Sequence, residues 1–371
     1  MKRRFLVIRW IVGLLFIFSG LIKANDPLGL SYKMQEFFGA WGLNGSLNDY
    51  TLALSLIMNV FEVLAGVAVI IGWRMKLFSW LLLLLIIFFT FLTGYALLSG
   101  KIKTCGCFGD CLPLTPLESF LKDLFLLLLI LVLFVNKNRI VSSLSSPVPQ
   151  ALLIICIAAV SWLQWYVQKH LPVLDCLPYK PGRNIVEEMK VPAGAVPDSF
   201  AITFKYKKNG KIVEFGESNF PADFDSTYQY VDRYDKLVKK GNAAAKIVDF
   251  SLQTLNGADT TIPILNQGNN YIMLFAKDLS HLDDWKKDMM DVQALAKTKE
   301  IPFFLVTGDK DRAVPAFGNN PDLHILVCDG TVIKTAARVN PTYFLMQQGN
   351  IKGKWSYADV EDAKKALMQL K

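Results

Sequence analysis

Five long apolar runs in the first 170 residues decide what this chain can fold into. Each run is about 19–23 residues long, and ~20 helical residues at ~1.5 Å each cross the ~30 Å hydrocarbon layer of a membrane. The alternative is a set of core helices in a large soluble protein, but five runs this close together leave too little polar surface to cover them. We therefore predict five membrane-spanning helices: Phe5–Ala24, Thr51–Trp73, Leu77–Leu98, Leu117–Val135 and Val148–Val167.

The excess positive charge lies at the ends of these runs. Residues 1–167 carry 13 Lys and Arg against 7 Asp and Glu, whereas residues 168–371 carry 27 against 25. This uneven distribution argues against nucleic-acid binding. The basic residues occupy the N-terminus and two short links without acids: Lys2, Arg3, Arg4 and Arg9, then Arg74 and Lys76, then Lys137 and Arg139.

Short basic segments stay in the cytoplasm, and this sets the expected orientation. The N-terminus is then inside, and the loops at 25–50 and 99–116 lie outside, with everything after the fifth run. For a bacterium with two membranes, this predicts an inner (plasma) membrane protein whose C-terminal half is periplasmic.

A dense cysteine cluster lies in one of the outer loops. Cys105, Cys107 and Cys111 fall within seven residues, and Gly106 and Gly109 between them allow tight backbone bends. The outer side is oxidising, so thiol–disulfide chemistry is expected there. Two lysines just upstream, Lys101 and Lys103, are expected to favour the nucleophilic thiolate.

Three kinds of site fit this cluster. A disulfide between Cys105 and Cys107 closes a very small ring, and strained disulfides are easily reduced, which suits exchange. A static loop disulfide is the second alternative, with Cys107–Cys111 the easier internal bond. A metal site is the third and needs a fourth ligand such as His170 or Cys176. Under exchange, Cys107 is the preferred nucleophile because it can pair either way.

The remaining cysteines have separate interpretations. Cys156 falls in the fifth run and is expected to be a packing residue. Cys328 lies in an apolar strand, where a buried structural cysteine is expected, and a long-range disulfide between Cys176 and Cys328 is the alternative.

Glu62 lies in the middle of the second run. A carboxylate at that depth is costly and usually faces the interior of the bundle, so a proton-shuttling role is one expectation. The alternative is a hydrogen bond to Arg9, Asn59 or a serine. Lys122 and Asp123, near the start of the fourth run, are expected to form an interfacial ion pair.

The part of the chain after the membrane runs divides into two segments with different sequence patterns. Residues 171–245 predict a small connector module, with a hairpin at Phe200–Tyr206 and Lys211–Phe215 around Asn209-Gly210, then a helix at Phe224–Lys240. Residues 246–371 alternate strands and helices, which is typical of an α/β sandwich. Its expected strands are Ile247–Leu252, Tyr271–Ala276, Ile301–Val306, Leu323–Cys328, Tyr343–Gln347 and Ile351–Trp355, with helices at Leu282–Ala296 and Tyr357–Leu370.

The N-terminal part resembles the DoxX/MauE group of small membrane proteins. The resemblance rests on Arg9-x3-Gly13, Phe16-x2-Ser19-Gly20-x2-Lys23, Glu62 with Gly66, and Cys105-Gly106-Cys107-Phe108-Gly109. More narrowly, it is similar to the Bacteroidetes branch with a long C-terminal extension. The resemblance covers roughly residues 5–140 and implies a four-helix membrane bundle, which we place at residues 1–140. The fifth apolar run then predicts a fifth helix at 141–170. It also implies redox work, either on disulfides of partner proteins or in passing electrons between thiols and the membrane.

The C-terminal part resembles a thioredoxin-like domain of the TlpA/peroxiredoxin kind. The matching residues are Asp249-Phe250-Ser251-Leu252 with Asn256-Gly257, the strand end Leu274-Phe275-Ala276, and Asn340-Pro341-Thr342-Tyr343-Phe344-Leu345 with Gly349 and Ile351. Pro341 matches the proline that is cis in that fold. The family's Cys-x-x-Cys should follow the strand at Tyr271–Ala276, but Lys277–Leu282 contains no cysteine. The domain therefore lacks the family's dithiol.

These observations predict a membrane-bound periplasmic thiol–disulfide factor. Cys105, Cys107 and Cys111 would exchange with client or redox partner proteins, and electrons would go to or come from a quinone or another membrane thiol carrier. The first rival is a non-enzymatic scaffold or assembly subunit, in which the cysteines are a staple and the degenerate thioredoxin-like domain is a docking surface. A transporter is the second rival, but the sequence shows no paired broken helices or repeated halves.

Overall fold

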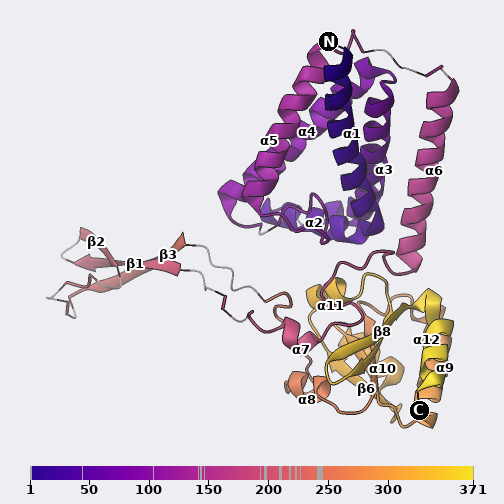
Figure 1. Cartoon of the computed structure of the whole chain (residues 1–371). Coiled ribbons are helices and arrows are strands. Elements are labelled where there is room, and N and C mark those ends of the chain that lie inside the picture. Colours follow the sequence, from indigo (N-terminus) through magenta and orange to yellow (C-terminus); the bar gives the residue numbers. More distant parts are fainter. Residues whose placement is uncertain are drawn as a thin grey trace. The chain divides into compact units, whose positions relative to one another are not determined.

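The computed structural model describes residues 2–370 apart from 44, 103, 141, 143, 146, 193, 196–198, 209–210, 217–218, 222–223, 226 and 240–244. The chain forms two compact units (Figure 1). Unit 1 comprises Met1–Gly182 together with Ser251–Lys371, and unit 2 comprises Arg183–Phe250. The predicted connector module at 171–245 thus overlaps unit 2, whose bounds lie further along the chain.

Long helices make up the first part of unit 1. They are α1 (Lys2–Asn25), α2 (Pro27–Ala40), α3 (Thr51–Ile71) with the 3-10 turn η1 (Ser46–Tyr50) before it, α4 (Met75–Ser99), α5 (Pro116–Val135) and α6 (Pro147–Lys169). Within the described residues, four helices are long and apolar enough to cross a membrane: α1, α3 with part of η1, α4 and α6. α5 is 20 residues long, but its first turns carry Glu118, Lys122 and Asp123. The protein is therefore a membrane protein.

Two glycines bring α1 and α3 into close contact. A Cβ added at Gly13 would lie 2.7 Å from the carbonyl oxygen of Gly66, and one added at Gly66 would lie 2.6 Å from that of Gly13. Small residues at helix interfaces let backbones approach in a membrane, where van der Waals packing drives association. The helices therefore hold a tight interface next to Glu62 on α3.

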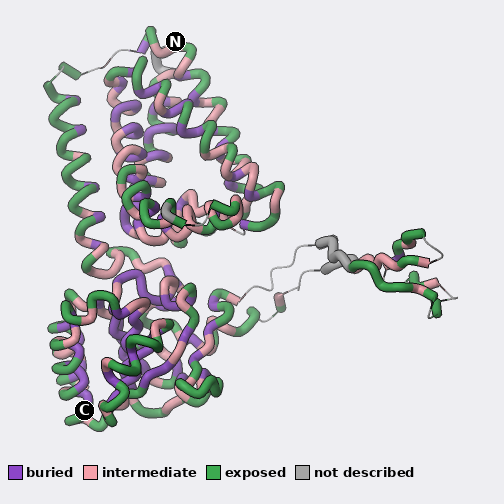
Figure 2. The backbone as a smooth tube through the Cα atoms, turned by 180° about the vertical axis from the view of Figure 1, so that it is seen from behind, coloured by how far each residue is buried: buried purple, intermediate pink, exposed green. Residues whose placement is uncertain are grey.

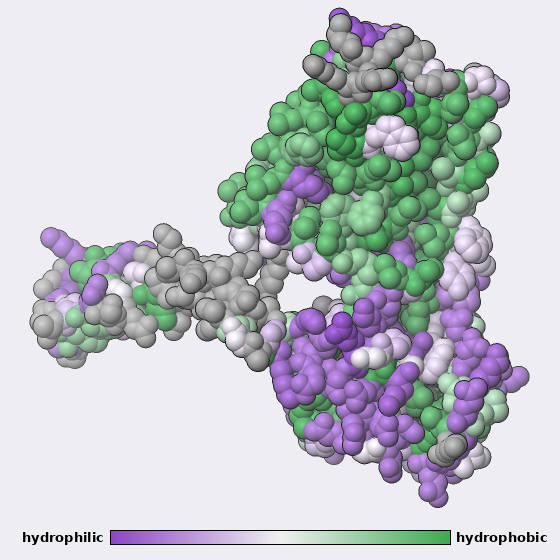
Figure 3. All heavy atoms as spheres, in the orientation of Figure 1, coloured by the Kyte–Doolittle hydropathy of each residue, from purple (hydrophilic) through white to green (hydrophobic). Residues whose placement is uncertain are grey.

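The outward surface of these helices is apolar. Figure 2 shows the buried residues on the sides of the helices that face one another. Figure 3 shows hydrophobic residues covering the helices, whereas hydrophilic ones gather over the C-terminal part. Large exposed side chains such as Ile57, Leu84 and Leu128 are each about 60% exposed or more. Exposed apolar area of this extent suits contact with lipid.

A helix occupies part of the predicted outer loop at 25–50. Asp26 caps α2 by accepting a hydrogen bond from the Gly29 N–H at 2.9 Å, and Pro27 takes the first helical position. Both are standard helix-start signals. This helix was not predicted from the sequence, because it lies between two much stronger apolar runs.

The C-terminal part of unit 1 is an α/β domain, as predicted. Its five-stranded sheet has the order β6-β5-β4-β7-β8. The strands are β4 (Tyr271–Ala276), β5 (Phe303–Thr307), β6 (Leu323–Val327), β7 (Thr342–Gln347) and β8 (Asn350–Ser356). β4, β5 and β6 run parallel, whereas β7 is antiparallel to both β4 and β8.

Helices surround this sheet. They are α8 (Thr261–Leu265), α9 (Lys286–Thr298) after η2 (Leu282–Asp284), α10 (Lys310–Phe317), α11 (Gly330–Ala336) and α12 (Val360–Gln369) after η3 (Tyr357–Asp359). Met289 of α9 and Leu367 of α12 share a core with Ile272 and Leu274. Every residue of β4 is buried, which explains its unbroken apolar sequence. The predicted strand at Ile247–Leu252 is wrong, since the neighbouring chain forms only two isolated bridges, from Gln253 to Asp259 and to Val327.

Unit 2 contains the short helix α7 (Ile185–Glu188) and a three-stranded antiparallel sheet of order β2-β1-β3. β1 (Ser199–Lys208) and β2 (Lys211–Gly216) form the predicted hairpin, whose Asn209-Gly210 turn lies outside the described residues. The helix predicted at Phe224–Lys240 is wrong, because this segment forms β3 (Gln229–Lys239) against β1. Tyr228 and Tyr230, two residues apart, both pack on Tyr206, which is strand spacing.

Candidate functional site

The cysteine loop links α4 to α5 and has defined ends. Gly100 ends α4 with φ of 64°. Thr115 begins α5 through a capping box with Glu118. Gly106 has φ of 69°, and a Cβ there would lie 3.1 Å from the Cγ of Lys33. Glycine is thus required between Cys105 and Cys107 both by the backbone and by the side chain of α2 that packs on it.

Cys105 and Cys107 are free and half-buried. Both line one cavity of ≈ 210 Å³ among the helices of unit 1. Its apolar wall includes Phe37, Trp41 and Phe88. The structure therefore brings the two thiols to one cavity next to aromatic rings.

Three lysines from different helices line the same cavity. Lys23 comes from α1, Lys33 from α2 and Lys122 from α5. Lys33 donates to the Thr104 hydroxyl at 3.2 Å. Lys122 forms a 2.8 Å ion pair with Asp123 and lies close enough to Cys107 for the charge of each to act on the other. The ion pair expected between Lys122 and Asp123 is present. The proximity of Lys122 to Cys107 was not predicted.

Burial keeps both thiols in the neutral form. It raises the pKa of Cys105 to about 11, with the neighbouring Cys107 adding to the effect. It also raises the pKa of Cys107, against which Lys122 acts as the largest opposing charge. The expectation of thiolates favoured by Lys101 and Lys103 is therefore wrong for the resting state, since burial outweighs nearby charge. Lys103 itself lies outside the described residues.

Glu62 is fully buried and joins the cysteine loop to α1. It forms an ion pair with Lys23 and accepts a hydrogen bond from the Ser19 hydroxyl at 2.9 Å. The Ser19 oxygen also lies 2.9 Å from the carbonyl oxygen of Cys107. A buried charge needs such a partner. Of the alternatives for Glu62, the serine contact is present, whereas Arg9 donates to the Val69 carbonyl at 2.9 Å instead.

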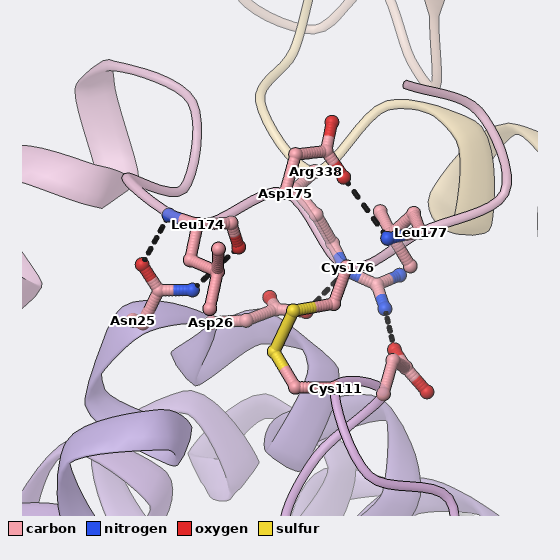
Figure 4. Close-up of a disulfide and its surroundings, with 9 residues drawn as sticks. Asn25, Asp26, Cys111, Leu174, Asp175, Cys176, Leu177 and Arg338 are labelled. Carbon is pink, nitrogen blue, oxygen red and sulfur yellow. Dashed lines mark hydrogen bonds and ion pairs between the residues drawn. A yellow bond between two sulfur atoms is a disulfide. The ribbon is translucent and has the colours of Figure 1, made fainter. Parts of the chain in front are cut away.

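The third loop cysteine is in a disulfide. Cys111 is bonded to Cys176, with Cα atoms 4.8 Å apart (Figure 4). This corrects two expectations, the Cys107–Cys111 bond and the Cys176–Cys328 bond. Cys328 is 3% exposed, and burial raises the pKa of its thiol to about 12. It is the buried structural cysteine that the apolar strand predicts.

An arginine from the C-terminal domain binds two carboxylates beside this disulfide. Arg338 donates to Asp26 at 2.8 Å and to Asp110 at 2.6 Å. Its side chain is 6% exposed. Burial opposes its charge, but Asp26 and Asp110 outweigh burial and raise the pKa of Arg338. The loop is thus fixed by one covalent bond and by one two-carboxylate ion pair.

A second set of contacts holds the segment around Cys176. Lys354 of β8 donates to Asp175 at 2.8 Å. The Asn25 side chain donates to the Leu174 carbonyl at 2.9 Å and accepts from the Leu174 N–H at 3.0 Å (Figure 4). Cys176 is therefore anchored from both α1 and the sheet.

The position expected for a dithiol in the C-terminal domain is filled by other groups. Asn340 accepts from the Lys277 N–H at 2.7 Å and donates to the Asp278 carbonyl at 3.0 Å. The Asn340–Pro341 peptide bond is cis. The segment after β4 thus lies beside this proline without a cysteine.

Metal ligands are not grouped in the part of the chain that the structure describes, where no set of three or more His, Cys, Asp and Glu side chains could hold an ion. His170, the fourth ligand considered for a metal, pairs with Asp359 at 2.6 Å. Cys176, the other fourth ligand considered, is bonded to Cys111 in the disulfide.

Sequence reasoning missed several residues of this site. Lys33, Asp110 and Arg338 were not singled out, and Lys122 was assigned only to an ion pair. A signal existed for Asp110, which directly precedes Cys111. Nothing in the sequence joins Arg338 to it, since the two lie 228 residues apart.

Comparison with known proteins covers two parts of the chain. Residues 1–136 match the family model described as methylamine utilisation protein MauE. Residues 200–240 match a domain of unknown function, DUF8463. No curated protein matches the chain, and no solved structure does. The N-terminal part is thus similar to a membrane protein family linked to methylamine utilisation.

Proposed function

We propose that the protein is a membrane-bound thiol–disulfide redox factor whose exchanging pair is Cys105 and Cys107. One observation carries the proposal. The two free thiols share a cavity with three lysines, while Cys111 is already paired with Cys176. The disulfide leaves the Cys-Gly-Cys pair available for exchange and fixes the loop that presents it.

The roles of the residues follow from their contacts. Cys107 is the nucleophile, because Lys122 lines the same cavity and its positive charge stabilises the thiolate that forms on attack. It attacks a sulfur of a client disulfide and forms a mixed disulfide. Cys105 then displaces the client, which leaves reduced, and a Cys105–Cys107 disulfide remains. The reverse sequence oxidises a client.

Glu62 would serve proton movement next to this pair. It is linked to the backbone of Cys107 through Ser19, and its charge is balanced by Lys23. A carboxylate held at this depth in a membrane bundle is costly and is usually functional. Release of a thiol proton during exchange needs an acceptor, and Glu62 of the buried Glu62–Lys23 pair is a carboxylate that lies beside the cysteine loop.

The proposed location is the periplasmic face of a bacterial inner membrane. The basic N-terminus and links favour this orientation. In it, α5 completes a four-helix bundle with α1, α3 and α4, and α6 is a fifth crossing. The Cys111–Cys176 disulfide supports this placement, because such bonds persist in oxidising compartments.

The C-terminal domain is proposed to be thioredoxin-like in fold and to act without a dithiol. Its strand order, its parallel and antiparallel pairings and the cis bond before Pro341 support the fold. Arg338, which precedes Asn340-Pro341 by two residues, donates to Asp110 in the cysteine loop. We therefore assign the domain to holding the loop and to docking partner proteins.

A scaffold without redox activity is the second candidate. It is favoured by the same missing dithiol and by the contacts that tie the domain to the loop. Under this alternative, Cys105 and Cys107 would be packing residues beside a single staple.

Trapping of partners separates the two candidates. A Cys105→Ser variant leaves Cys107 unable to resolve a mixed disulfide, so clients should accumulate as bands on non-reducing gels. A Cys107→Ser variant should trap few or none. Cys156→Ser, in α6, is the matched control. If Cys105→Ser traps no more than the control, exchange is refuted and the scaffold stands.

A further inference from the structure

The cavity at the two thiols has the chemistry of a ring-binding site. Its volume is ≈ 210 Å³, which exceeds the roughly 150 Å³ apolar cavity known to hold a benzene ring. Aromatic side chains, including Phe37, Phe38 and Trp41, make up much of its wall. Such a wall accepts a flat apolar ring or two fused rings.

Part of this cavity's wall is polar and reactive. Cys105, Cys107 and Lys122 lie there, with the Thr93 hydroxyl among the lining groups. An ammonium group has three N–H donors, so Lys122 can bind Asp123 and still donate to an oxygen on a ligand. A ligand with carbonyl oxygens on its ring would thus find donors and thiols together.

An open apolar groove continues from the cavity towards lipid. The groove lies between α3 and α4 and shares Leu54, Met58 and Phe88 with the cavity wall. Its other lining residues are also apolar, among them Ile57 and Leu84, which are 67% and 59% exposed. A hydrocarbon chain attached to the ring would fit this groove and reach the membrane.

A cavity with a thiol end and a lipid-facing groove selects one class of ligand. A phospholipid would fill the groove with an acyl chain, but its charged head group does not suit an aromatic wall. A water-soluble oxidant would gain nothing from the groove. A ring that carries carbonyls and a hydrocarbon tail uses all three regions.

We propose that this site binds a lipid-soluble quinone, with its ring at Cys105 and Cys107 and its tail in the α3–α4 groove. The inference rests on the proposed exchange function and names its electron acceptor. The two thiols lose two electrons and two protons and form one Cys105–Cys107 disulfide. The quinone gains them and leaves as the quinol. Lys122 donates a hydrogen bond to the ring oxygen that becomes negative. The Lys23–Glu62 ion pair, which Ser19 contacts, takes up a thiol proton and passes it on during the transfer.

The test uses the full-length protein in lipid nanodiscs under anaerobic conditions, pre-reduced so that Cys105 and Cys107 are thiols. The probe is a naphthoquinone with a short polyprenyl tail. Quinol formation is followed by absorbance, and thiol loss by alkylation and mass spectrometry. We expect one quinol for every two thiols lost, with the loss confined to Cys105 and Cys107.

Variants locate the site. Met58→Trp fills the neck that the cavity and the groove share, and Leu54→Trp fills it from the adjacent turn. Either should slow quinone reduction more than tenfold while exchange with a disulfide-bonded peptide stays within about twofold. Leu128→Trp, a 60% exposed position on α5, is the matched control and should leave both rates unchanged.

Several results would overturn the inference. One is wild-type protein that exchanges with the peptide but forms no quinol, which leaves the proposed function intact. Another is a polyprenyl alcohol without a ring that binds as tightly as the quinone and causes no thiol loss, which marks a structural lipid only. Equal rates in Met58→Trp, Leu54→Trp and Leu128→Trp would place quinone reduction elsewhere. Failure of peptide exchange itself would instead refute the proposed function.

Discussion

Arg338 and Asp110 lie 228 residues apart in the chain, yet the guanidinium donates to the carboxylate at 2.6 Å. Asp110 directly precedes Cys111, so this ion pair adjoins the disulfide with Cys176. The same guanidinium holds Asp26, the cap of α2. One side chain thus fixes the start of α2 and the end of the cysteine loop.

Loss of Arg338 is expected to loosen the loop. Arg338→Ala should cost on the order of 2 kcal/mol in unfolding free energy, because a charged hydrogen-bond partner is removed from the partly buried Asp26. It should also make Cys111–Cys176 more accessible to dithiothreitol. Thermal unfolding in detergent and timed reduction with mass spectrometry measure the two effects. Arg312→Ala, at a largely exposed arginine of α10, is the control, and equal effects from both would contradict the clamp.

The charge of Lys122 is expected to set the reactivity of Cys107. Lys122→Met removes the largest charge that lowers the pKa of this thiol. Iodoacetamide labelling of Cys107 at pH 8 should slow by about tenfold, since a nearby opposite charge shifts a pKa by roughly one unit or more. Lys122→Arg should restore most of the rate. Unchanged labelling in Lys122→Met would remove Lys122 from the mechanism.

Labelling of Cys105 should follow its raised pKa. Burial raises the pKa of this thiol to about 11, so the neutral form dominates at pH 7. Because only the thiolate reacts, the rate should climb about tenfold per pH unit and level off near pH 11. Short-time labelling that reads the earliest rates at each pH checks this. A plateau below pH 9 would mean that the thiol is less buried than the structure has it.

Removal of one partner from the buried Lys23–Glu62 pair should be costly. Lys23→Met leaves the Glu62 carboxylate at 0% exposure without its cation, which costs about 3–5 kcal/mol in similar buried pairs. The double variant Lys23→Met with Glu62→Leu should be more stable than Lys23→Met alone. Thermal denaturation in detergent compares them. Additive losses would show that the two side chains do not interact.

Gly106→Ala tests the bend between the exchanging thiols. Gly106 and Gly42 both have positive φ, 69° and 72°, so alanine costs about 1–2 kcal/mol at either position. A Cβ at Gly106 also meets Lys33 at 3.1 Å, whereas one at Gly42 meets nothing within 4 Å. Gly106→Ala should therefore impair exchange and Gly42→Ala should not. Equal exchange in both variants would mean that Lys33 moves aside freely.

The sequence predicted those parts of the fold that have a strong local signal. Long apolar runs predicted the membrane helices, and the buried strand β4 was expected at Tyr271–Ala276, where it lies. β3 was mistaken for a helix because its pairing with β1 is non-local and its alternation rests on tyrosines. The helix α2 was missed although Asp26 and Pro27 signal its start.

The site was predictable only in part for the same physical reason. Cys105 and Cys107 were singled out because three cysteines in seven residues is a local pattern. The partner of Cys111 was not, since Cys176 lies 65 residues away and sequence spacing does not fix disulfide pairing. The charge effect was judged from Lys101 and Lys103, whereas burial by distant helices decides the pKa of both thiols.

The central claim is that Cys105 and Cys107 carry out thiol–disulfide exchange, whereas Cys111 and Cys176 form a stable structural disulfide. Differential alkylation of protein from intact cells tests this claim most directly. Mass spectrometry would read the redox state of each cysteine before and after a mild reductant. The account predicts a mixture of reduced and oxidised Cys105 and Cys107 that shifts with the reductant, beside a Cys111–Cys176 bond that resists it. If Cys105 and Cys107 stay in one state under both oxidant and reductant, they do not exchange, and the account is contradicted.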